Sequence, residues 1–110
     1  MSDQIEAPRV TARLLDNFIG RHVRIVGQVI ELRGDQAVIN SDGAVTILLN
    51  RDAHLSQNGG AQIIGKVNPD LSIKALNSVN LGDNVDYKLY GMVVEVTHKF
   101  PQIFLTGTSQ

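Results

Sequence analysis

Three histidines are the side chains of this 110-residue sequence with the clearest capacity for metal or acid–base chemistry: His22, His54 and His98. A helical metal site typically pairs two ligands four residues apart, and these histidines are widely separated in the chain. The chain has no cysteine, which excludes disulfides, thiolate ligands and a cysteine nucleophile. We therefore expect no metal site, and we interpret His98 as a positive charge that suits the end of a helix.

The motifs of other enzyme classes are incomplete in this chain. Gly65-Lys66 lacks the rest of a phosphate-binding loop, and no Gly-x-Ser-x-Gly sequence marks an activated serine. Asp83 and Asp86 resemble a pair of catalytic carboxylates, but acidic groups also favour the start of a helix, which explains them more simply. The sequence predicts a protein that is not an enzyme and that takes no cofactor and no small-molecule substrate.

The composition indicates one soluble domain. Ten Lys+Arg residues oppose eleven Asp+Glu residues for a net charge of -1, and 43% of the residues are hydrophobic. A near-neutral chain does not suit a protein whose main task is to neutralise phosphates. No apolar run reaches the ~18–20 residues of a membrane helix, and the acidic stretch 1–6 is not a secretory signal.

The hydrophobic pattern predicts a loose arm over 1–8, then a short helix, five strands and a long final helix. Thr11 can cap a helix over 11–19, and Gly20 can end it in a left-handed conformation. The first strand, 22–32, changes the parity of its apolar residues, which indicates a bulge near Val26-Gly27. The other strands are expected at 36–40, 44–49, 61–67 and 71–81, with a tight turn at 41–43 and room for a helical turn near 51–55.

This order of elements is typical of an OB-fold barrel. Three strands form a meander, two more follow a connection, and a central glycine lets the long first strand serve two sheets. We expect a mostly β, five-stranded single OB-fold domain over 1–110, with its barrel at about 21–81. The final helix is expected over about 83–99, capped by Asp83 with Asp86 as a second member and ended by Pro101.

The final helix is predicted to carry apolar side chains on two opposite faces. At 100° per residue the larger face spans an arc of roughly 100° and the smaller one roughly 60°. The larger face holds Met92, Val85, Val96, Leu89, Phe100 and Val93, and the smaller holds Tyr90, Val94 and Tyr87. A small barrel can cover only one of these faces, so the other is predicted to pack on helices of different chains. The alternative is that both tyrosines simply lie on the barrel or in solvent with their hydroxyls wet.

The predicted barrel lacks a surface on which nucleic-acid bases could stack. OB barrels that bind single strands combine aromatic platforms with a basic groove, and all three phenylalanines and both tyrosines lie outside the predicted strands. Arg33, Lys66 and Lys74 are the possible minor DNA contacts, although solvated surface charge is the simpler explanation. A free-standing OB module that itself binds single-stranded nucleic acid is the alternative hypothesis.

Short motifs along nearly the whole chain, from Pro8 to about Phe104, identify a resemblance by their order and spacing. They are Pro8-Arg9-Val10, Leu15 with Phe18-Ile19, Val26-Gly27, Ser41-Asp42-Gly43, Gly65-Lys66-Val67, Leu89-Tyr90 and His98-Lys99-Phe100-Pro101-Gln102. Together they resemble the smallest subunit of replication protein A, the eukaryotic heterotrimeric single-stranded-DNA-binding protein. The chain departs from that family's pattern at 50–60 and at Gly91, which would either admit a close partner helix or simply be tolerated.

The resemblance implies a non-catalytic subunit whose C-terminal helix joins one helix from each of two larger subunits in a three-helix bundle. Carried onto this chain, the contacts would be Val85, Leu89, Tyr90, Met92, Val93 and Val96, together with Tyr87 and Val94. The resemblance also implies that the larger subunits hold most of the DNA, and that the complex supports DNA replication, repair and recombination in the nucleus. No Lys/Arg run provides an import signal, so we expect the chain to enter with its partners.

Overall fold

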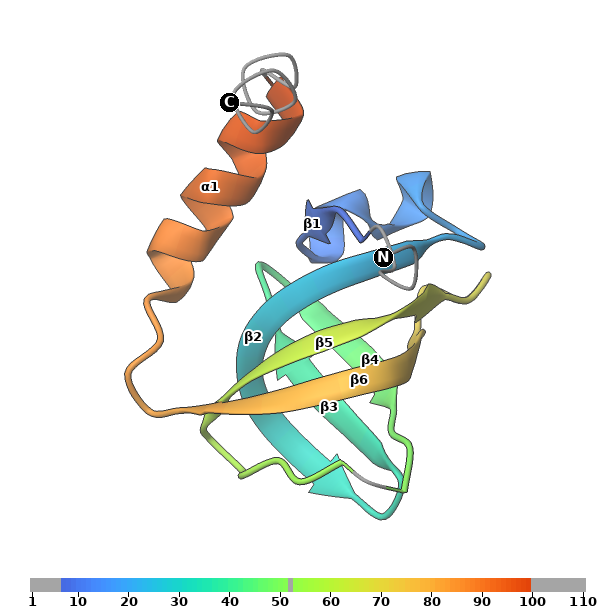
Figure 1. Ribbon diagram of the computed structural model, residues 1–110, viewed down its shortest axis with the longest axis vertical. Helices are drawn as coiled ribbons and strands as arrows, with labels where there is room; N and C mark the ends of the chain where they lie inside the picture. The colour runs from blue at the N-terminus through green and yellow to red at the C-terminus, as the bar shows by residue number, and fades with distance from the viewer. Residues whose placement is uncertain (1–6, 52, 100–110) are drawn as a thin grey trace, which may run out of the picture.

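The computed structural model describes residues 7–51 and 53–99 and contains six strands and two helical elements (Figure 1). In chain order these are β1 Arg9–Val10, the 3-10 helix η1 Ala12–Asn17, β2 His22–Arg33, β3 Gln36–Asn40, β4 Ala44–Leu48, β5 Gly60–Val67, β6 Ile73–Gly82 and α1 Tyr87–Lys99. The strands form one sheet in the order β1-β2-β3-β4-β6-β5, and β2 also pairs with β5. The five longer strands therefore close into a barrel, and the predicted OB-fold is confirmed.

The long strand β2 serves two neighbours, as predicted, and its glycine marks the corner. From His22 to Gln28 it pairs with β5, and from Gln28 to Arg33 it pairs with β3. A Cβ atom on Gly27 would lie 2.7 Å from the backbone oxygen of Asn40, so only glycine permits this approach.

The bulge of β2 lies further along the strand than its sequence suggested. The register with β3 shifts between Val29 and Glu31, so the predicted bulge near Val26-Gly27 was wrong. The odd-numbered residues of β2 face the core up to Val29, which is fully buried. Ile30 is the extra residue at the bulge, and its side chain is 42% exposed. The glycine bends the strand without inserting a residue, and the insertion follows three positions later.

The N-terminal segment differs from its prediction in two ways. Arg9 and Val10, which follow the predicted arm over 1–8 and had no predicted strand, form a short parallel ladder with Arg24 and Ile25 of β2. The following helix is a 3-10 helix of 6 residues rather than an α-helix over 11–19, and Thr11 makes no side-chain cap bond. So short an element gains little from α-helical hydrogen bonds, and 3-10 turns suit its connecting role. Gly20 is left-handed, as predicted, with φ of 83°.

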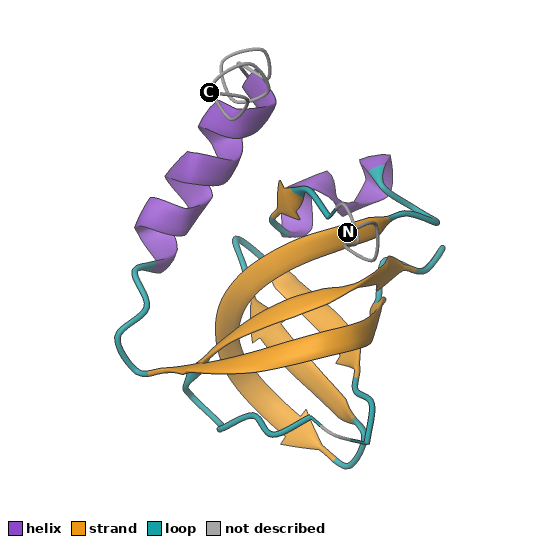
Figure 2. Ribbon diagram, viewed as in Figure 1, coloured by secondary structure: helices purple, strands orange, loops and turns teal. Residues whose placement is uncertain are grey.

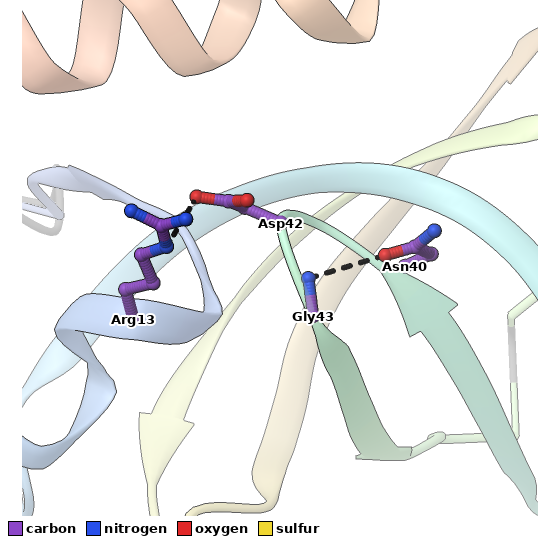
Figure 3. A network of polar contacts seen from close by, with 4 residues as sticks. All are labelled: Arg13, Asn40, Asp42 and Gly43. Atoms are coloured by element: carbon purple, nitrogen blue, oxygen red, sulfur yellow. Dashed lines mark hydrogen bonds and ion pairs between the residues drawn. The ribbon is translucent and has the colours of Figure 1, made fainter.

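The turn between β3 and β4 is the predicted tight turn. Asp42 and Gly43 have positive φ values of 59° and 135°, and the Gly43 amide donates to the side-chain oxygen of Asn40 at 3.2 Å. Figure 3 shows the Asp42 carboxylate reaching the guanidinium of Arg13 in η1, 2.9 Å away. The turn therefore ties η1 to the barrel rim.

Two other connections are less regular than predicted. The described part of 50–59 has no helix; two turn bonds join the Ala53 amide to the Asn50 oxygen at 3.3 Å and the Gly59 amide to the Ser56 oxygen at 3.1 Å. The last strand begins at Ile73 rather than at Leu71, which has a positive φ of 70°. Asp70 prolongs that turn, since its carboxylate accepts hydrogen bonds from the amide and the hydroxyl of Ser72 at 3.0 and 2.6 Å.

The core fills the barrel with β-branched side chains. Ile25, Ile39, Ile47, Ile63 and Ile73 are fully buried, one from each of the five long strands. From η1 and the residue that follows it, Leu15 and Phe18 complete the same cluster. Because the barrel closes its own core, α1 is not needed to cover it.

The helix α1 begins four residues later than expected, at Tyr87. Asp86 is the capping residue, since its carboxylate accepts from the Leu89 amide at 2.9 Å and its backbone oxygen accepts from the Tyr90 amide at 3.0 Å. The prediction that Asp83 starts the helix was therefore wrong. The segment before Asp86 is needed to carry the chain from β6 past Gly60, where a Cβ atom would overlap Val85. The expected effect of Pro101 on Phe100 lies outside the described residues.

Candidate subunit interface

The smaller apolar face of α1 is the one that meets the chain's own barrel. The Tyr90 hydroxyl donates to the backbone oxygens of Val10 and Arg24, at 2.8 and 3.0 Å, sharing its one proton between β1 and β2. One turn further on, Val94 is 1% exposed. Figure 2 shows α1 beside the barrel and connected to it through one loop, so these contacts set how the helix is presented.

The environment of the two tyrosines agrees with this placement. Burial raises the pKa of Tyr90 to about 12, and the charges of Arg9 and Arg24 and hydrogen bonds with the backbone oppose that rise only in part. Burial also raises the pKa of Tyr87, helped by the negative charge of Asp83. A hydroxyl that stays protonated suits a donor to backbone carbonyls.

His98 makes a second docking contact, which the sequence did not predict. Its Nε2 atom lies 2.7 Å from the backbone oxygen of Arg9. The imidazole ring of His98 meets the Phe18 ring edge to face, with 5.7 Å between centroids. The guanidinium of Arg21 lies over the Phe18 ring, 4.8 Å from its centroid. His98 stands in the last turn of α1, as expected, and its side chain is half-buried.

The larger face of α1 is uncovered. Leu89, Met92, Val93 and Val96 are 54%, 54%, 37% and 42% exposed, and we call these four residues the apolar stripe. Their spacing is i, i+3, i+4 and i+7, which places them on one side of the helix. At 100° per residue the stripe is centred roughly 140° from the tyrosine side. This spacing is typical of a helix that packs against other helices.

The structure thus divides the predicted interface residues into two groups. The apolar stripe remains available to a partner. Tyr90 and Val94 are occupied by the chain's own barrel, because one donates to its backbone and the other is buried. Val85 was predicted on the larger face, but it precedes α1 and flanks Gly60 of β5, as Tyr87 does, so both residues belong to the docked side.

Gly91 lies away from the stripe. It lines a groove of about 270 Å³ between α1, η1 and the β3–β4 turn, together with Val94, His98 and Leu14 among others. A Cβ atom built on Gly91 would meet nothing within 4 Å. Its missing side chain therefore does not serve a close approach at the stripe, which was one of the two interpretations of the sequence.

The basic residues singled out as DNA contacts lie on the barrel, far from α1 in the chain. Arg33 pairs with Glu31 at 2.8 Å on the exposed surface. Lys66 of β5 and Lys74 of β6 stand directly opposite each other in the ladder and are exposed.

Three other features of the described residues would indicate a different function: a metal site, a membrane-spanning helix and free aromatic side chains. Among residues 7–51 and 53–99, no three His, Asp or Glu side chains gather as a metal site would require. None of the helices in those ranges combines the length and apolar character needed to span a bilayer. The phenylalanine and tyrosine residues of that part of the chain all lie where α1 and the segment before it contact the barrel. They are Phe18, Tyr87 and Tyr90.

Comparisons with known proteins agree on one family. The family model described as Replication factor A protein 3 matches residues 1–104. A curated relative of that name from Schizosaccharomyces pombe is 33% identical over 97 residues, which cover 88% of this chain and 93% of the relative.

Solved structures extend the comparison to the fold. A chain in the structure of U. maydis Replication protein A bound to ssDNA is 28% identical, with a TM-score of 0.84 over 92% of this chain and 97% of that one. The S. pombe Stn1-Ten1 complex contains a chain with the same fold at 16% identity, with a TM-score of 0.73 over 91% and 97% of the two chains. The sequence resemblance is thereby confirmed, and the chain belongs to the Replication factor A protein 3 family.

Proposed function

We propose that this chain is a non-catalytic assembly subunit of a heterotrimeric single-stranded-DNA-binding complex. In this role α1 joins one helix from each of two larger subunits in a three-helix bundle. The larger subunits hold most of the DNA, and the complex acts in replication, repair and recombination in the nucleus, which the chain enters with its partners. Relatives named as replication factors, one of them in a complex bound to ssDNA, support this class of function.

The apolar stripe is the observation that carries the proposal. The four side chains of the apolar stripe are exposed to water, while the opposite side of the same helix is docked on the barrel. Full burial of one such side chain contributes about 1.5–3 kcal/mol of free energy. Covering the exposed parts of these four side chains in a complex would contribute a fraction of that amount from each. Two partner helices, one on each side of the stripe, fit its width better than one.

Docking through Tyr90 supports the proposal further. A helix held at a fixed angle to its barrel loses little orientational freedom when it joins a bundle, which reduces the cost of association. A free-standing DNA-binding module would need neither an exposed stripe nor a fixed helix, and it would need base-stacking residues that the described part of the barrel does not provide.

The test is co-expression with the two larger subunits and sizing of the product. Leu89→Glu combined with Val93→Glu places two charges in the stripe and should abolish the heterotrimer, because both carboxylates would be buried unpaired. The control is Lys88→Glu combined with Lys99→Glu, which reverses two charges on the polar flank of the same helix and should leave the heterotrimer intact.

Thermal unfolding of each isolated chain accompanies the sizing, since the stripe is exposed and its substitution should change stability by no more than about 0.5 kcal/mol. A heterotrimer of normal yield with the Leu89→Glu, Val93→Glu chain, folded as well as the unsubstituted one, would remove the proposal.

A further inference from the structure

A row of residues paired from strand to strand crosses the five long strands, from Arg33 at the end of β2 to His22 at its start, and it includes three outward-facing cations, Arg33, Lys66 and Lys74. The ladder pairs are Arg33 with Gln36, Gln36 with Leu48, Leu48 with Lys74, Lys74 with Lys66 and Lys66 with His22. Directly paired residues share a face of the sheet, and none of these six is buried, so the whole row points outward. We call it the basic row.

The centre of the basic row is electrostatically unfavourable in the free protein. Lys66 and Lys74 face each other across two strands about 4.8 Å apart, and like charges in that position destabilise a sheet. Neither lysine forms an ion pair with a described carboxylate. The nearby Asp70 directs its carboxylate to Ser72. An external anion would relieve this repulsion.

The row continues from the lysines to a third cation. Arg33 lies three inter-strand spacings from Lys74, no more than about 14 Å at ~4.8 Å per spacing. Its partner Glu31 holds it by an exposed pair, 82% and 46% accessible, and such pairs contribute little. The guanidinium can therefore turn to another acceptor. Positive charges repeated at this spacing fit a chain of phosphates better than one compact anion.

We propose that the basic row contacts the phosphates of single-stranded DNA as the strand passes over this barrel, without reading its bases. No phenylalanine, tyrosine or tryptophan belongs to the row, so it offers no large aromatic platform for base stacking. The contact is an electrostatic supplement to binding by the larger subunits, and in that respect it rests on the proposed function. The near-neutral net charge of -1 agrees with a local contact rather than with a general affinity for polyanions.

The salt dependence of DNA binding tests this inference. The assembled heterotrimer with Lys66→Gln and Lys74→Gln is titrated with poly(dT) at several salt concentrations, beside the unsubstituted complex. A phosphate contact to a single strand contributes about 0.7 to the slope of log K against log salt, so losing two should reduce its magnitude by about 1.4. The affinity ratio of the two complexes should then shrink by about sevenfold for a fourfold rise in salt.

The control removes the same charge elsewhere. Lys88→Gln with Lys99→Gln leaves the basic row intact and should keep the original slope. Sizing of each complex reports assembly separately, so failure of the proposed function is distinguished from failure of this inference. The isolated chain is titrated at low salt as well, where the Lys66→Gln, Lys74→Gln variant should lose weak binding that the unsubstituted chain retains. Equal slopes for the substituted and unsubstituted proteins would overturn the inference.

Discussion

The hydroxyl of Tyr90 donates to the backbone oxygen of Val10 at 2.8 Å, so the final helix is fastened to the first strand of the sheet. Because β1 pairs with the same stretch of β2 that supplies the second acceptor, the contact lies where three elements meet. Figure 1 shows α1 standing at the end of the barrel that carries β1. The apolar stripe, on the other side of the helix, is thereby turned away from the barrel.

Replacing Tyr90 with phenylalanine removes this hydroxyl and keeps the ring. The part-buried backbone oxygens of Val10 and Arg24 then lose their hydrogen bond from α1. The free energy of unfolding should fall by about 1–3 kcal/mol. Urea denaturation of the isolated chain measures the change. Tyr87→Phe is the matched control, since no hydrogen bond of the Tyr87 hydroxyl is found in the described structure, and it should shift stability by less than about 0.5 kcal/mol. Equal effects of the two substitutions would contradict the docking contact.

The same tyrosine should make stability depend on alkaline pH. The folded state raises the pKa of Tyr90 to about 12 from 10.0, because burial disfavours the phenolate. Its contribution is complete below pH 10 and is lost as pH rises through 12, since the unfolded chain releases the proton first. Stability should decline by up to about 1.4 kcal/mol per pH unit in this window. Tyr90→Phe should show a shallower decline, measured by denaturation at each pH; parallel curves for the two proteins would refute the assignment.

Two glycines should respond oppositely to alanine. Gly91 is inside α1 and has open space where its Cβ would stand, so Gly91→Ala should raise stability by about 1 kcal/mol through helix propensity. Gly65 of β5 has no such space, because a Cβ there would overlap the backbone oxygen of Lys74. Gly65→Ala should therefore destabilise the barrel. Thermal melts of both variants decide, and a loss of stability in Gly91→Ala would show that the groove beside it is filled.

The helix cap gives a prediction that separates two aspartates. Asp86→Ala removes the acceptor of the Leu89 amide and should cost about 1 kcal/mol, with fraying of the first turn seen as reduced helical circular dichroism. Asp83→Ala should have little effect on either quantity, because Asp83 lies outside α1. A larger loss of stability for Asp83→Ala than for Asp86→Ala would instead support the longer helix predicted from the sequence, which begins at Asp83.

Much of the fold could be read from sequence because its signals are local. Alternating apolar residues predict the long strands, and the turn at Asp42-Gly43 requires positive φ values that glycine accepts readily. The strand β1 was missed because two residues carry no periodicity. The bulge was misplaced because Gly27 and the inserted Ile30 affect apparent parity within the same few positions. A glycine that permits close approach and one that marks a bulge look alike in sequence.

The candidate interface was only half predictable. Helical periodicity found both apolar faces of α1, but it carries no information on which face the barrel takes. The signal that could have found it is chemical: the hydroxyl of a buried Tyr90 must find an acceptor, and the backbone oxygens of Val10 and Arg24 at the β1–β2 ladder provide two. Leu89, Met92, Val93 and Val96 have no polar atom in their side chains, which suits a seam between helices. The sequence predicts His98 only as a dipole partner, because its contact with Arg9 spans 89 positions.

The burial of the apolar stripe in the assembled complex is the most direct test of the central claim. The chain has no cysteine, so Met92→Cys introduces one reporter thiol on the stripe, and Asp35→Cys places another in the exposed turn between β2 and β3. The rate of thiol alkylation of this chain, followed by mass, is compared before and after assembly with the larger subunits. We predict that the thiol at position 92 becomes protected while that at position 35 stays reactive. An unchanged rate at position 92 in a fully assembled complex would contradict the account.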